Sequence, residues 1–417
     1  MSRPPRIDAV KLTDNERSML AGEQGPVRQT ALEHQLQVAA FFGAADLVPV
    51  SQAHVMADTE SLGEHGVRWL ESLAAHPDAR CRVRIPTITD PRGTDFVHAA
   101  RLGQSEAIVA LERRAIAAFV KLGVLMTDTC INYQTVMPAI RGEHVAFGDT
   151  GVVIYANSIA GARTNFEGGP SALAAGLTGC TPRYGFHLDA CRQPTLRVTV
   201  RWTPRELNGW GALGGVSGQH GGDYWAVPYN EGIERTPSSD EHKHFGAAMA
   251  SFGSIAMFHL AGITPDACDR RQIDALPARD VGEAEVRALH AKYQTDDTID
   301  VVVFSAPQLS LHELSRLATL MQGRQVVIPV LAVTSPQVKP DADRLGLTSV
   351  IETAGGTVLS GMCFYQSYAR EIAEANGWKR LATNSAKMTN ILGGYGYSPT
   401  LLSMEACVDA ATKGRLP

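Results

Sequence analysis

The sequence lacks the features that direct a protein to a membrane, to nucleic acid or to a nucleotide. The N-terminus has no apolar core of a secretory leader, and no apolar run reaches the ~18 residues of a membrane-spanning helix. Lys and Arg (38) are fewer than Asp and Glu (43) and form no basic stripe, which argues against a nucleic-acid partner. Neither a phosphate-binding GxxxxGK loop nor a dinucleotide-binding glycine pattern is present. We therefore expect a cytoplasmic protein without nucleotide-dependent chemistry.

Cysteine is scarce and scattered, which excludes a disulfide framework. The 7 cysteines lie far apart, and no C-x-x-C pair occurs. In a reducing compartment such cysteines are usually buried small apolar residues. Any cysteine that has another role must be identified from its neighbours in the fold.

The chain contains enough apolar residues and turns for several α/β domains. It has 417 residues, of which 44% are hydrophobic, with 39 Gly and 22 Pro. Strand-like runs alternate with helix-like runs at both ends, which predicts parallel βαβ units. Thr13 and Glu16 resemble a capping box. We expect domains at 1–140, 141–290 and 291–417. The predicted strands are 47–51, 81–86, 123–127, 299–304, 326–333 and 357–360; the predicted helices are 29–42, 60–75, 105–122, 311–321 and 341–353.

The middle of the chain, 145–290, is rich in glycine. Strings such as GALGGVSGQHGG predict loops that approach a ligand closely, or tight turns between short strands. Within this region Glu241-His-Lys-His244 looks like a metal-binding tract. Its charged flanks and the lack of a third ligand group nearby favour a solvated loop instead.

Ligands bind at the carboxyl ends of strands in open α/β sheets, and this rule selects among the cysteines. Cys130 follows the predicted strand 123–127, and Cys363 follows 357–360. Cys180 lies on a Gly/Pro turn after the glycine-rich GARTNFEGG segment. Cysteines from distant loops can hold iron or an iron–sulfur cluster, because thiolates are soft ligands. The alternative is that all three are simply buried thiols.

Two polar segments could bind or transform a substrate. In the first, Arg163 offers a fork for a carboxylate, Thr164 and Asn165 offer hydrogen bonds, and Glu167 is a possible acid or base. The alternative is a structural Arg163–Glu167 ion pair. In the second, Ser385 and Lys387 place a hydroxyl and an ammonium two residues apart. The alternative there is an ordinary helix N-cap.

Short motifs along nearly the whole chain resemble those of the aconitase X family. The most specific is Gly161-Ala-Arg-Thr-Asn-x-Glu-Gly-Gly-Pro-Ser-Ala-Leu173. The others include Leu12-Thr-Asp-x-Glu16, Cys130-x-x-Tyr133, Tyr155-Ala-Asn-Ser158, Tyr184-Gly-x-His-Leu188, Gly262-Ile-Thr-Pro-Asp266, Ser310-Leu-x-Glu-Leu314, Cys363 and Ser385-Ala-Lys387. They occur in the family's order.

This resemblance implies an aconitase-like large subunit of about three α/β domains around a central cleft. It implies a hydro-lyase acting on a small hydroxy acid, with an iron–sulfur cluster (2Fe-2S, 3Fe-4S or 4Fe-4S) or iron. Bacterial members dehydrate cis-3-hydroxy-L-proline to a pyrroline carboxylate, which is the expected reaction here. Archaeal members act on mevalonate 5-phosphate, which is the alternative substrate. A small swivelling domain is expected as a separate subunit, and a catalytically silent homologue is the other alternative.

The resemblance also assigns roles, although four positions depart from the family pattern. Asn132 replaces a proline, Ala306-Pro307-Gln308 replaces a Pro-His pair that in some relatives adjoins a cysteine, Cys180 replaces a basic residue, and Phe147-Gly-Asp-Thr150 differs from Glu-Ser-Ser. The expected metal ligands are Cys130, Cys363 and Cys180. Arg163 and Lys387 are expected to bind the substrate carboxylate, with Ser158, Thr164, Asn165 and Ser385 nearby. Glu167, Ser385, Lys387 or a partner residue would carry the catalytic proton transfer and charge stabilisation.

Overall fold

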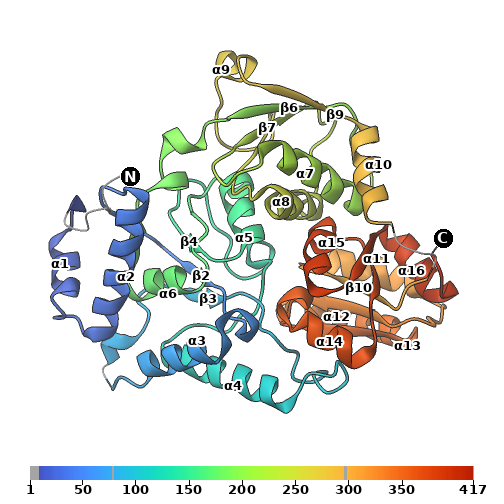
Figure 1. Cartoon of the computed structure of the whole chain (residues 1–417), viewed down its shortest axis with the longest axis horizontal. Coiled ribbons are helices and arrows are strands. Elements are labelled where there is room, and N and C mark those ends of the chain that lie inside the picture. Colours follow the sequence, from blue (N-terminus) through green and yellow to red (C-terminus); the bar gives the residue numbers. More distant parts are fainter. Residues whose placement is uncertain (1–8, 78, 295–297, 417) are drawn as a thin grey trace.

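The computed structural model describes residues 9–77, 79–294 and 298–416, which form three α/β parts around a common centre (Figure 1). Each part has a parallel sheet with helices packed against it. Within these residues no helix is both long and apolar enough to cross a bilayer. The predicted α/β class with parallel βαβ units is confirmed.

The first part is built on a three-stranded parallel sheet in the order β3-β2-β4, beside an antiparallel pair of β1 and β5. Thr13 and Glu16 form the predicted capping box of the first helix. The strands are β1 (Leu47–Pro49), β2 (Ala53–Val55), β3 (Thr87–Thr89), β4 (Ala146–Phe147) and β5 (Cys180–Pro182); the helices are α1 (Asp14–Leu20), α2 (Pro26–Phe42), α3 (Thr59–Ala74), α4 (Glu106–Lys121), α5 (Thr150–Tyr155) and α6 (Pro170–Thr178).

Two strands predicted in this part are wrong. In 81–86 the backbone N–H groups of Val83 and Arg84 donate to Leu122 and Gly176 at 2.8 Å, at the ends of helices. These N–H groups therefore bond to residues near helix ends instead of to a neighbouring strand, and Pro86 has no N–H to donate. The strand starts at the next residue. Segment 123–127 is reduced to a single bridge between Ile88 and Leu125.

The second part has a parallel sheet in the order β8-β7-β6-β9. The glycine string predicted as loop is instead helix α7, and the glycines allow it to lie against α8. A Cβ on Gly214 would come within 2.1 Å of the Phe245 carbonyl oxygen, and one on Gly218 within 2.6 Å of that of Met249. The strands are β6 (Leu196–Val200), β7 (Pro228–Glu231), β8 (His259–Leu260) and β9 (Ala278–Val281); the helices are α7 (Leu207–Gly221), α8 (Ser239–Gly253), α9 (Arg270–Asp274) and α10 (Glu283–Lys292).

The third part is a five-stranded parallel sheet in the order β12-β11-β10-β13-β14. Helices cover both faces of the central strand β10, which is buried along its whole length. The predicted helix 341–353 is divided in two at Gly346, whose φ is +75°. The strands are β10 (Val301–Leu309), β11 (Val330–Thr334), β12 (Gly356–Ser360), β13 (Arg380–Thr383) and β14 (Ser398–Leu401); the helices are α11 (Leu311–Met321), α12 (Lys339–Arg344), α13 (Leu347–Thr353), α14 (Ala369–Asn376), α15 (Ala386–Leu392) and α16 (Met404–Lys413).

A network of buried charges joins the second and third parts. Lys243 on α8 is fully buried, and its Nζ pairs with the Glu313 carboxylate of α11 and donates to the Gln308 carbonyl at 3.1 Å. His244 Nε2 lies 2.8 Å from Glu313. Burial opposes ionisation of Glu313, but the nearby Lys243 and His244 lower its pKa to about 2. The solvated loop predicted at Glu241–His244 is therefore wrong, because the segment is buried in α8 and Lys243 and His244 find their partner across the interface.

We expect Lys243→Met to destabilise the chain strongly. The change removes the cation next to Glu313 and leaves a buried carboxylate paired only with His244, which costs about 3 kcal/mol. Equilibrium denaturation by urea measures this loss. Lys413→Met is the matched control: Lys413 pairs with Asp409 at 3.2 Å, but its side chain is 56% exposed. That variant should stay within about 0.5 kcal/mol of the wild type. Equal stability of the two variants would show that the network does not hold the parts together.

Candidate functional site

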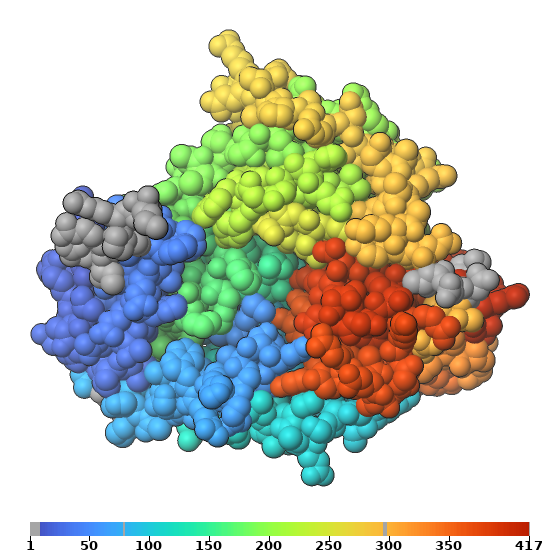
Figure 2. Space-filling view, in the orientation of Figure 1, coloured from blue at the N-terminus to red at the C-terminus, as the bar shows by residue number. Residues whose placement is uncertain are grey.

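Two parallel sheets present their carboxyl edges to the same region. Arg92, which follows β3, forms a backbone bridge with Met362, which follows β12, so the two edges are in contact. In such sheets ligands bind at this edge. In Figure 1 the two sheets lie on either side of the centre, and Figure 2 shows the blue, green and red parts meeting there. Near this edge lie Asp58, Asp90, Cys130 and Asp149 from the first part and Gln308, Cys363, Ser385 and Lys387 from the third; Gln308 is near the end of β10, and Lys387 is in the first turn of α15.

The thiols of Cys130 and Cys363 meet at this junction. Both side chains are buried. The neighbouring Cys363 thiol, together with burial, raises the pKa of Cys130 well above its usual range. The Gln308 backbone N–H also donates to Cys130 Sγ at 3.4 Å, and Ser305 Oγ lies 3.9 Å from Cys363 Sγ. Two cysteines that are remote in sequence thus share one buried spot.

The ammonium of Lys387 lies next to these thiols. Its Nζ is 3.4 Å from Asp149 Oδ1 and 5.4 Å from the centre of the Tyr365 ring. Burial alone would lower the pKa of Lys387, but Asp149 and the two thiols outweigh that effect and raise it. The lysine therefore stays charged and can hold an anionic group of a substrate.

Asp149 is the functional candidate that sequence reasoning missed. It follows β4 after one glycine, and its Oδ2 accepts the Gly151 and Val152 N–H groups at 2.6 and 3.0 Å, which starts α5. The other oxygen is the one near Lys387. The available signal was an aspartate one residue after a short apolar strand, in the segment Phe147-Gly-Asp-Thr150. The sequence alone marks this segment only as a departure from the family pattern.

Ser385 serves mainly to position Lys387. Its Oγ accepts the Met388 N–H at 3.2 Å and donates to the Ala306 carbonyl at 2.6 Å. It is thus the N-cap of α15, the alternative considered from the sequence, and it also ties this helix to β10. Lys387 lies in the first turn of that helix.

The side chains of the GARTNFEGG segment (161–169) bond to other parts of the chain and do not join Cys130, Cys363 and Lys387. Arg163 pairs with Asp189 and donates to the His187 carbonyl at 3.1 Å. The structure thus separates Arg163 from Lys387, with which the sequence grouped it, because the guanidinium is engaged elsewhere. The neutral side chains of Thr164 and Asn165, and of Ser158 just before the segment, also form hydrogen bonds with backbone groups. Ser158 accepts the Phe258 N–H, Thr164 accepts the Phe147 N–H, and Asn165 donates to the Tyr184 carbonyl and accepts the Phe186 N–H.

Cys180 and Glu167 also have their partners outside the cluster. The Cys180 thiol packs in the apolar core next to Met19 and Leu32, within 3.6 Å of Thr178 Oγ1. None of the interactions found for Cys180 in the described part of the chain reaches Cys130 or Cys363. Glu167 accepts a hydrogen bond from Thr181 Oγ1 at 2.9 Å, and burial raises its pKa to about 7.

The ligands that the junction offers to a metal that prefers sulfur are two thiols, those of Cys130 and Cys363. Iron–sulfur clusters are held by three or four cysteine thiolates or by histidines in their place. Across residues 9–77, 79–294 and 298–416, no group of three or more His, Cys, Asp or Glu side chains is placed to hold a metal. A cluster on three protein thiolates does not fit these residues. Two thiols can still bind an iron ion.

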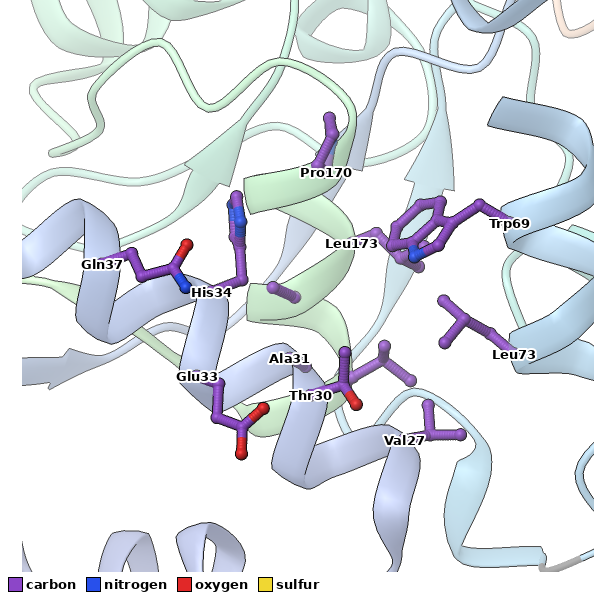
Figure 3. A pocket seen from close by; sticks show the side chains of 12 residues that line it. Val27, Thr30, Ala31, Glu33, His34, Gln37, Trp69, Leu73, Pro170 and Leu173 are labelled. Carbon is purple, nitrogen blue, oxygen red and sulfur yellow. The ribbon is translucent and has the colours of Figure 1, made fainter. Parts of the chain in front are cut away.

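A separate cavity of about 440 Å³ lies between α2, α3 and α6 (Figure 3). Its walls are mostly apolar, with Trp69, Pro170 and Leu173 facing it and His34 at one side. His34 Nε2 lies 2.8 Å from Ser171 Oγ. Neither thiol nor Lys387 lines this cavity, so the groups capable of chemistry converge elsewhere.

The chain is similar in sequence and in structure to known dehydratases. Models of the aconitase X first, second and third domains match residues 9–190, 194–291 and 299–413. A phosphomevalonate dehydratase large subunit from Methanothermobacter thermautotrophicus is 34% identical over 97% of each chain. A cis-3-hydroxy-L-proline dehydratase from Pseudomonas aeruginosa is 29% identical over 99% of this chain and 71% of its own length. The crystal structure of holo aconitase X from Thermococcus kodakaraensis has a TM-score of 0.86 and 31% identity, and covers 96% of this chain and 100% of that one.

We expect Glu167→Gln to stabilise the chain above neutral pH and to leave turnover intact. Because the pKa of Glu167 is raised from 4.5 to about 7 in the folded state, the wild type should lose stability relative to the variant as pH rises from 4.5 to 7. The difference should reach about 3 kcal/mol at pH 8 and vanish at pH 4. Glutamine keeps the acceptor for Thr181. Melting temperatures at both pH values test this, and a hundredfold loss of turnover would return Glu167 to the catalytic groups.

Proposed function

This chain belongs to the aconitase X family, and we propose that it removes water from a small hydroxy amino acid, with cis-3-hydroxy-L-proline as substrate and a pyrroline carboxylate as product. One observation carries this proposal: the buried Lys387 ammonium lies 3.4 Å from Asp149 Oδ1, where the two sheet edges that carry Cys130 and Cys363 meet. A dehydratase needs a cation for the carboxylate, a base for the α-proton and help for the departing hydroxide. The junction offers a candidate for each.

In this proposal Lys387 binds the substrate carboxylate and stabilises the charge that develops on it. Asp149 Oδ1 accepts the α-proton, because its other oxygen is engaged in capping α5. The C–H electron pair becomes a carbon–carbon double bond, and the C–O bond breaks so that hydroxide leaves and takes up a proton from solvent to become water. The enamine that remains tautomerises to the pyrroline. Ser385 is a positioning residue, since both of its hydrogen bonds serve the fold.

A metal ion on Cys130 and Cys363 would supply Lewis-acid assistance to the hydroxyl group. The residues of this chain hold the two thiols together, exclude water by burial and keep a positive charge on Lys387. We also propose a separate small subunit, as the name of the archaeal relative implies for that protein. All 7 cysteines are free thiols, which supports a reducing compartment such as the cytoplasm.

The charges at the junction favour an amino acid over a phosphate ester. Besides Lys387, the main charge there is the Asp149 carboxylate. Burial raises the pKa of Asp90 well above its usual range, and burial lowers the pKa of His54, which lies 3.5 Å from Asp90. Arg92 is nearby, but its guanidinium is paired with Asp128. The cationic ring nitrogen of a hydroxyproline would be attracted by Asp149. A phosphate dianion would be repelled by it and would need additional cations.

The substrate assay distinguishes the two classes. The chain, co-purified with its small subunit, should convert cis-3-hydroxy-L-proline with a kcat/KM at least 100-fold above that for mevalonate 5-phosphate. Product formation measured by absorbance or mass spectrometry gives both values. A preference for mevalonate 5-phosphate would contradict the substrate proposed, and no turnover of either by a folded, metal-loaded complex would favour a silent homologue.

Asp149→Asn tests the proposed base. An asparagine can still cap α5, so the variant should fold, but it cannot take up a proton. We expect kcat to fall by about 10²- to 10⁴-fold. Asp269→Asn is the matched control, because Asp269 caps α9 by accepting the Arg271 N–H at 2.9 Å. The control should keep its activity. If Asp149→Asn keeps full turnover, the base is another group.

A further inference from the structure

A second cavity, of about 380 Å³, lies between the first and second parts of the chain. Thr150 and Val153 of α5 line it from the first part together with Phe166, and Tyr224 and Ile255 line it from the second. Helix α5 lies near the centre of the molecule, where the three parts meet (Figure 1). None of the lining residues in the described chain carries a charge. Mostly apolar cavities of this size are typical binding sites for small organic molecules.

Thr150 connects this cavity to the proposed site. The Lys387 Nζ lies 3.4 Å from Thr150 Oγ1 and 3.4 Å from Asp149 Oδ1. Thr150 therefore lines the cavity and also contacts the ammonium that is proposed to hold the substrate carboxylate. A ligand whose carboxylate binds Lys387 can extend past Thr150 into the cavity.

The aromatic wall of the cavity is held in place from two directions. Phe166 forms a backbone bridge with Phe147 of β4, and its N–H donates to Tyr224 Oη at 2.7 Å. The Tyr224 ring in turn packs against the rings of Phe186 and Trp225, with centroids 5.6 and 4.8 Å apart. A wall that is fixed before the ligand arrives loses little conformational entropy on binding.

We propose that this cavity is the specificity pocket of the site: it takes the apolar ring of an amino acid whose carboxylate binds Lys387, and Phe166 and Tyr224 determine which substrates fit. An uncharged lining disfavours a second anionic group, because a phosphate buried there would lose its water without gaining a partner. The cavity thus favours a cyclic amino acid over a phosphate ester for a reason that does not involve Asp149. The inference rests on the proposed function for the role of Lys387, but unreactive ligands test it without turnover.

L-Proline and glycine test the pocket, because they carry the same charges and differ only in the ring methylenes. Neither has a hydroxyl group to lose. Their Kd values are measured by calorimetric titration of the full chain, purified without air and with its partner if one co-purifies. We expect L-proline to bind about 10- to 50-fold more tightly than glycine, because each buried methylene contributes about fourfold. Equal Kd values, or no measurable binding of L-proline, would overturn the proposal.

L-Prolinamide tests whether the ring and the carboxylate are bound at one continuous site. It keeps the ring and the ring nitrogen but lacks the negative charge that Lys387 would hold. We expect it to bind about 10-fold more weakly than L-proline, since it loses a hydrogen bond to a charged group. Equal Kd values for the two would show that the ring binds without Lys387, which would contradict the continuous site.

Phe166→Ala assigns the ring preference to this cavity. The preference for L-proline over glycine should fall about 5-fold, because the ring loses part of its apolar wall, and the Kd of glycine should not change. Phe41→Ala is the matched control: Phe41 is 74% exposed and its ring contacts Phe42, with centroids 4.8 Å apart. The control should keep the preference of the wild type.

An unchanged preference in folded Phe166→Ala would place the ring elsewhere and overturn the assignment. Because the Phe166 side chain is 41% exposed, we expect this variant to fold. The proposed function can fail separately: a chain that binds L-proline with this preference but does not dehydrate cis-3-hydroxy-L-proline would keep the pocket and lose the reaction.

Discussion

The structure depends on one constraint: the carboxyl edges of two parallel sheets from opposite ends of the chain must meet. The backbone bridge of Arg92 and Met362 fixes that contact. Each edge alone contributes only part of the proposed site: Cys130 and Asp149 lie on one side, and Cys363 and Lys387 lie on the other. Because the reactive groups are divided in this way, the site exists only when the first and third parts are docked.

The second part contributes to the site indirectly, by supporting that docking. Helix α8 lies close against α7 because glycines such as Gly214 leave room for its backbone. From α8, Lys243 reaches the Gln308 carbonyl and Glu313. A buried charge network therefore reaches Gln308, whose side chain donates to both segments that carry the thiols. Stability of the interface and geometry of the site are coupled in this fold.

The sequence predicted the elements of the fold better than it predicted the site. Alternating patterns located strands such as β12 and helices such as α11. The strand-end rule selected Cys363 after β12, and it selected Cys130 after a segment that the structure reduces to a single bridge. The polar content of the GARTNFEGG segment was misleading, because Arg163 bonds to Asp189 and the neutral side chains bond to backbone. Local pattern could not show that α7 tolerates glycine through close helix packing, nor that Asp149 faces Lys387. Both facts arise from contacts between segments far apart in the chain.

X-ray absorption at the metal edge of the purified protein tests the central claim most directly, because it counts the sulfur atoms bound to the metal. We expect sulfur ligands at about 2.3 Å from the metal in the wild type and fewer of them in Cys130→Ser or Cys363→Ser. A first shell without sulfur would show that the two thiols do not share a metal.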